Sequence, residues 1–148
     1  RPEVVRKLTR NIGHLDPAQE PEAAKKYEHL LQHVNVKDLL FCHNVVSKTF
    51  AHGRHRGMPV HSLVKACHGA RGPPPDIPPL VAMQEGHALW VVFGNRRLKA
   101  LKDFAWKAPF EVKCPVIVHQ YNDCPSALVA KYIEASTTEN GGTSASWA

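Results

Sequence analysis

The sequence has no long hydrophobic run. Its most apolar stretches, such as Ala88 to Phe93, have only the length of a β-strand. A helix that crosses a membrane needs about twenty apolar residues in succession. The sequence therefore predicts a protein without a membrane partner.

Cysteine is scarce and shows no recognisable spacing. There are four cysteines, and no two of them form a C-x-x-C pair: Cys42, Cys67, Cys114 and Cys124. This number is too low for a disulfide-built scaffold, and the ten histidines add no zinc-ribbon or HExxH spacing. We expect reduced, mostly buried thiols, no metal site, and an intracellular location in the cytoplasm or nucleus.

Aromatic residues are also few, at 7% of the chain. Three of them, Trp90, Phe93 and Phe104, fall on predicted core faces, so the sequence shows no series of stacking platforms for nucleic-acid bases. The formal net charge of +6 permits attraction to phosphates, nucleotides or nucleic acid without identifying any of them.

What is present is enough for one domain. The 148 residues are 43% hydrophobic, which supplies a single core of ordinary size. We expect a loose N-terminal arm over residues 1–19, a domain over residues 20–135, and a disordered, polar tail over residues 136–148.

Hydrophobic periodicity and turn residues predict helices and strands without a repeat. The expected elements are a helix over 22–33, a strand within 34–41, a short helix over 43–50, a helix over 59–67, a hairpin of strands 80–83 and 88–93, a helix over 96–105, a strand over 111–119, and a last helix that includes 128–133. The proline-rich segment 69–79 is a loop. This order predicts a small α+β (mixed α/β) domain with a short mixed sheet flanked by helices.

The junction between Phe93 and Arg97 is the candidate site. A buried strand ends at Gly94, and a basic helix begins at once, so the free N–H groups and the dipole of its first turn favour a bound anion. Gly94 permits close approach of a ligand, and the guanidinium groups of Arg96 and Arg97 can hold phosphate or carboxylate oxygens in pairs. A capped surface helix with solvated arginines would show the same short pattern, so spacing alone leaves both interpretations open.

The segment Leu89 to Leu101, LWVVFGNRRLKAL, follows an extended IPPLVAM segment and precedes a closing strand at residues 112–118. This succession resembles the ParB/sulfiredoxin-like superfamily, in which the motif reads Gly-Glu-Arg-Arg in ParB-type domains and Gly-Cys-His-Arg in sulfiredoxins. The resemblance covers roughly residues 34–119, and only the junction is specific. Of the motif residues, this chain retains Gly94, Arg96, Arg97 and Ala100.

A second stretch, from Phe41 to Arg54, resembles eukaryotic and algal members of the superfamily. It ends in the pattern Phe-x-x-Gly-Arg. This similarity implies that Arg54 faces the same ligand as Arg96 and Arg97.

The resemblance implies a nucleotide phosphate site, occupied by CTP in ParB-type proteins and by ATP in sulfiredoxins, usually with magnesium. Its residues here would be Gly94, Asn95, Arg96, Arg97 and Arg54. Asn95 stands where sulfiredoxins have their nucleophilic cysteine and ParB-type domains their glutamate, and an amide is neither a general base nor a good magnesium ligand. We therefore expect nucleotide or phosphate binding with little or no turnover, and no catalytic residue is assigned. Any activity would be nucleotide hydrolysis or phosphoryl transfer.

Two other hypotheses remain open. The same arginines, with Arg54, Arg56 and Arg71, would serve a non-enzymatic nucleic-acid-binding module that tracks phosphates. A degenerate domain would instead serve as a protein-interaction unit, with the proline loop 72–79 as an extended ligand.

Overall fold

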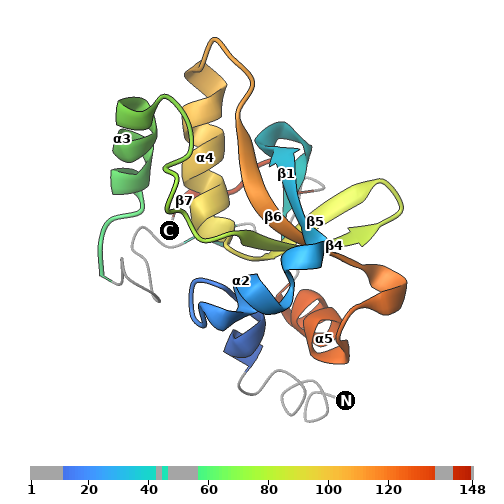
Figure 1. Cartoon of the computed structure of the whole chain (residues 1–148). Coiled ribbons are helices and arrows are strands. Elements are labelled where there is room, and N and C mark those ends of the chain that lie inside the picture. The colour runs from blue at the N-terminus through green and yellow to red at the C-terminus, as the bar shows by residue number, and fades with distance from the viewer. Residues whose placement is uncertain (1–11, 43–44, 47–56, 136–141, 148) are drawn as a thin grey trace.

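The computed structural model describes residues 12–42, 45–46, 57–135 and 142–147 (Figure 1). Its centre is a mixed five-stranded sheet in the order β1-β6-β4-β5-β2. The strands are β1 (Leu31–Asn35), β2 (Leu39–Phe41), β4 (Leu80–Glu85), β5 (Ala88–Phe93) and β6 (Lys113–Gln120). β4 runs antiparallel to β5 and parallel to β6, whereas β1 is antiparallel to β6 and β2 is parallel to β5. The expected α+β class is confirmed.

Helices cover both faces of this sheet (Figure 1). α3 (His61–Ala70) and α4 (Asn95–Lys107) lie on one face. The other face carries α2 (Glu22–Lys26), α5 (Ser126–Ala135) and the 3-10 turns η1 (Ile12–Leu15) and η2 (Glu28–Leu30). None of the helices in the described residues is long and apolar enough to cross a membrane.

β4 shows how the sheet divides the core in two. Leu80 and Ala82 pack toward α3 and α4, whereas Val81 and Met83 pack toward η1 and α5. Successive side chains of a strand point to opposite faces, so a strand covered on both sides is apolar throughout. This is the origin of the unbroken LVAM run in the sequence.

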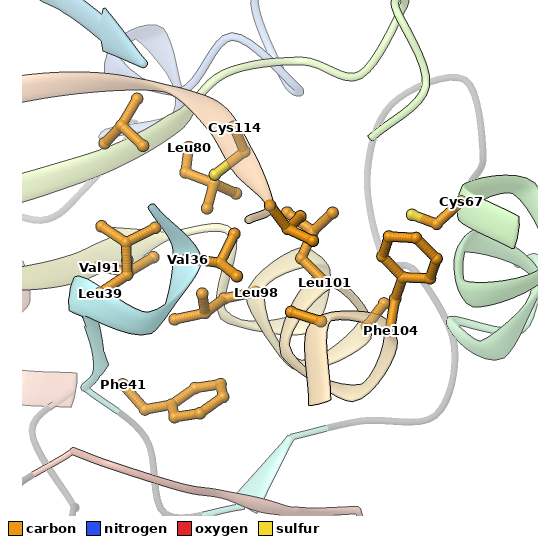
Figure 2. Packing of buried hydrophobic residues seen from close by; sticks show 14 of the residues in the cluster. Val36, Leu39, Phe41, Cys67, Leu80, Val91, Leu98, Leu101, Phe104 and Cys114 are labelled. Atoms are coloured by element: carbon orange, nitrogen blue, oxygen red, sulfur yellow. The ribbon is translucent and has the colours of Figure 1, made fainter. Parts of the chain in front are cut away.

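The larger core lies between α4 and the sheet (Figure 2). α4 contributes Leu98, Leu101 and Phe104, which follow one another at the three-residue spacing of a helix face. Cys67 of α3 lies beside the Phe104 ring (Figure 2). Full burial of a leucine or phenylalanine side chain contributes about 1.5–3 kcal/mol, so this face anchors the start of α4 firmly.

Two expected helices differ in the structure. The helix expected over residues 22–33 ends at Lys26, and residues 31–35 form β1 instead. Val45–Val46 is strand β3, which pairs in parallel with β7 (Ser146–Trp147), where we expected a helix over 43–50. In both places pairing with a distant segment overrides local helical preference. The other residues of 43–50, like Arg54 and Arg56, lie outside the described residues.

The arm expected over residues 1–19 is not loose in its described part. Leu15 and Asp16 are buried, and η1 packs beneath the sheet with Ile12. Residues 1–11 lie outside the described residues.

Part of the tail expected to be disordered is also packed. Gly142 accepts a hydrogen bond from Phe41 N–H at 2.8 Å, and Ala145 is buried in the larger core. Gly142 has φ of +81°, and a Cβ there would lie 2.8 Å from both Phe41 O and Trp90 Cζ3. A glycine-rich composition therefore permits close packing here, where we interpreted it as disorder. Residues 136–141 and 148 lie outside the described residues.

Substituting Gly142→Ala tests this attachment. The added methyl group meets backbone and an aromatic ring at a positive φ, so we expect a loss of about 1–3 kcal/mol of unfolding free energy. Urea denaturation gives the loss, and hydrogen exchange at Phe41 shows its location. Gly69→Ala is the control, because a Cβ at Gly69 meets nothing within 4 Å and alanine is the better helix former. An equal loss in both variants would contradict the prediction.

Candidate anion-binding site at the start of helix α4

Gly94 forms the corner between β5 and α4. Its φ of +104° lies in the left-handed region, and a Cβ there would lie 2.5 Å from Leu80 Cδ2 and 2.9 Å from Arg97 Nη2. Its carbonyl accepts the first helical hydrogen bond, from Leu98 N–H at 2.8 Å. Only glycine fits this corner, because both the conformation and the space exclude a side chain.

Asn95 is a structural bridge. Its side chain is buried, with the residue 5% exposed. Its Nδ2 group donates to Val91 O at 2.8 Å, and its Oδ1 atom accepts from Cys42 N–H at 3.1 Å. The amide thus fastens the end of β2 to β5 and to the start of α4. One donor and one acceptor are needed, which explains an amide at this position better than a carboxylate or a thiol would.

Arg97 is buried as well, at 7% exposure, and faces inward. Its Nη1 group donates to Pro78 O at 2.6 Å and to Pro79 O at 3.1 Å. Its Nη2 group lies 3.3 Å from Asp16 Oδ1 in an ion pair. Burial lowers the pKa of Arg97 from its ordinary value, and the neighbouring Asp16 carboxylate opposes this effect.

Asp16 is held in place from its own side of the contact. Its Oδ1 atom also accepts from Ala18 N–H at 3.0 Å, and its Oδ2 atom accepts from Gln19 Nε2 at 3.0 Å. The carboxylate is therefore fixed by a local turn before it meets Arg97, and the pair joins the N-terminal segment to α4.

Arg96 is the arginine of the pair that reaches the surface. It is half-buried and forms no ion pair with another residue in the described ranges. The first turn of α4 has no side-chain cap. Unpaired N–H groups of a first turn point away from the helix body and favour an anion. Arg96 and the backbone are thus the groups of this junction that can receive a ligand.

Two other basic residues of α4, Lys99 and Lys102, make contacts within the fold. Lys99 Nζ lies 3.2 Å from Asp103 Oδ1, and Lys102 Nζ lies 5.6 Å from the centre of the Phe41 ring. The positive charge of these two lysines is therefore partly neutralised or covered.

The three buried cysteines are poor nucleophiles. Burial raises the pKa of Cys42 to about 12, of Cys67 to about 11 and of Cys114 to about 12. A thiol reacts as the thiolate, so these groups are inert at neutral pH. Within the part of the chain that the structure describes, no three histidine, cysteine or acidic residues are grouped to hold a metal ion.

The proline loop is folded back rather than extended. Ile77 N–H donates to Pro74 O at 3.1 Å, and the next two carbonyls, of Pro78 and Pro79, are bound by Arg97. These contacts make the loop a rigid connector into β4. Arg71, which the nucleic-acid hypothesis includes, is exposed at the end of α3.

In comparisons with known proteins, no protein-family model matches the chain, and no curated protein matches its sequence.

The buried ion pair can be tested by removing one partner. Arg97→Met leaves Asp16 buried without its counter-charge, so we expect a loss of about 3–5 kcal/mol of unfolding free energy. The double variant Asp16→Leu, Arg97→Met removes the stranded carboxylate and should recover part of this loss in urea denaturation. A single-variant loss below about 1 kcal/mol would mean that the ion pair between Arg97 and Asp16 contributes little to the stability of the fold.

Asn95→Asp tests the amide bridge. The carboxylate still accepts from Cys42 N–H but cannot donate to Val91 O, so we expect a loss of about 1–3 kcal/mol of unfolding free energy. Asn122→Asp makes the same chemical change at an exposed position in η4 (Tyr121–Asp123) and should leave the free energy nearly unchanged. Equal effects of the two substitutions would argue against a bridging role.

Proposed function

We propose that this chain is a ParB/sulfiredoxin-like domain that binds a nucleotide or another phosphorylated anion at the start of α4, with little or no turnover. The observation that carries the proposal is the uncapped first turn of α4 beside the half-buried guanidinium of Arg96, which pairs with no carboxylate among the residues that the structure describes. Both groups donate hydrogen bonds and neither accepts them, which suits phosphate oxygens.

The proposal divides the expected site residues into two groups. Gly94, Asn95 and Arg97 form a frame that fixes the corner, because their contacts are internal. Arg96 and the backbone N–H groups would contact the ligand directly. Arg54 is proposed as an additional contact on the strength of the sequence resemblance.

Phosphate suits this junction better than a resident metal ion does. Magnesium prefers carboxylate and water oxygens, and the carboxylate held here, Asp16, is buried against Arg97. A magnesium ion would therefore arrive with the phosphates of CTP or ATP. The buried amide of Asn95 cannot remove a proton from water, which supports binding in preference to hydrolysis.

The alternative function, a nucleic-acid-binding module, would have fewer free positive charges than the number of basic residues in the sequence suggests. Arg97 is buried and Lys99 is paired with Asp103, so neither offers a free charge for tracking phosphates. We also place the protein inside the cell, in the cytoplasm or nucleus, which the four free cysteines support.

The proposed site is tested by calorimetry and thermal shift with CTP, ATP and GTP, each with and without magnesium. A ligand that binds only the folded chain raises its melting temperature. Arg96→Ala should weaken binding at least tenfold, because a hydrogen bond to a charged group contributes about 1.5–3 kcal/mol. Lys107→Ala is the matched control, since it removes the same charge from an exposed position at the other end of α4.

A clear negative is available. If no nucleotide binds the intact protein, the proposal fails. If both variants weaken binding equally, the ligand responds to net charge and not to the start of α4.

A further inference from the structure

The most unusual buried polar group lies on the opposite face of the sheet from α4. His119 of β6 is 2% exposed, and its Nε2 atom has no hydrogen-bond partner among the described residues. Buried polar atoms nearly always have partners, and an exception requires an explanation.

Its neighbour is an aromatic ring. Tyr27, which follows α2, meets His119 edge to face, with ring centres 4.9 Å apart and planes at 73°. On β4 the residue in register with His119 is Met83, which is buried and apolar. A neutral imidazole is tolerated in such surroundings, whereas an imidazolium ion is not.

The charged and titratable groups on the adjoining elements do not compensate a positive ring. Lys26 Nζ lies 5.3 Å from the centre of the Tyr27 ring, and His29 of η2 adds a like charge when protonated. The carboxylates of these elements, Glu22 of α2, Glu28 of η2 and Asp123 of η4, are exposed, as is the phenol of Tyr121. None of the ion pairs in the described ranges includes His119.

The cover over His119 includes a short helix that buries little side-chain surface. We define the N-terminal layer as residues 12–30, which contain η1, α2 and η2. α2 is five residues long and buries one side chain, that of Ala23. Segments with few buried apolar contacts open before the core does.

We propose that His119 is an acid-sensitive latch: when its ring takes up a proton, Tyr27 and the N-terminal layer leave the sheet so that the charge reaches water. Because the layer also carries Asp16, its release removes the counter-charge of Arg97 at the corner of α4. The latch thus connects acidity to the frame of the anion site, although it requires no ligand to operate.

The direction of the pH effect follows from linkage. Burial, assisted by His29, lowers the pKa of His119 from its ordinary 6.5 in the folded chain. The closed layer therefore keeps its full stability above pH 6.5 and loses it as the pH falls toward the lowered pKa. One proton taken up on opening increases the opening constant by up to about tenfold per pH unit.

Hydrogen-exchange mass spectrometry on the full chain between pH 7.5 and 5 tests the latch. Protection factors corrected for intrinsic rates should fall with pH in residues 12–30 and stay level in β5. The variant His119→Phe keeps the ring contact without a titratable group and should remove the pH dependence. His119→Gln, which is also non-titrating, serves the same purpose if the phenylalanine variant does not fold.

His33→Gln is the control, since this histidine is exposed on β1 and its loss should leave the pH dependence intact. The proposal is overturned if His119→Gln retains the acid response of the layer. It is equally overturned if NMR shows His119 titrating near its ordinary pKa while residues 12–30 stay protected.

Discussion

The guanidinium group of Arg97 is the contact on which the arrangement of this chain depends most. It ties together three segments that are distant in sequence: the turn at Asp16, the end of the proline loop, and the first turn of α4. An ion buried in this way is costly unless it is paired and hydrogen-bonded, and here two carbonyls and a carboxylate accept from the planar guanidinium group. The position of α4 over the sheet is thus fixed by a polar contact as well as by the apolar packing of Leu98, Leu101 and Phe104.

This constraint changes the interpretation of the Gly-Asn-Arg-Arg junction. Two adjacent arginines look equivalent in the sequence, but a helix turns by about 100° per residue, so one faces the interior and the other the surface. Arg97 serves the frame, and Arg96 is the arginine that remains for the ligand we propose. Asn95 likewise works as a bridge between backbone groups, which accounts for its identity without any catalytic role.

Much of the fold follows from local pattern. The β4–β5 hairpin, the apolar face of α4 and helices α3 and α5 were predictable because each has a strong period of its own. β1 was not predictable as a strand, since residues 31–35 lack such a pattern and become extended only by pairing with β6. The corner at Gly94 was predicted correctly, whereas the partners of Asn95 and Arg97 were not. Asp16 is 81 positions away from Arg97, and no short-range signal in a sequence reveals a contact of that span.

The hydrogen bonds at the end of β2 have a consequence for the order in which the molecule assembles. Consecutive peptide groups there are bound by opposite parts of the chain: Phe41 N–H by Gly142, and Cys42 N–H by Asn95. Closing such long loops lowers the chain entropy before the stabilising contacts have formed. Distant pairings of this kind therefore slow folding. The hairpin and α4 can form from neighbouring sequence alone. The surroundings of β2, by contrast, are complete only when residues near the end of the described chain have been synthesised and have returned to it.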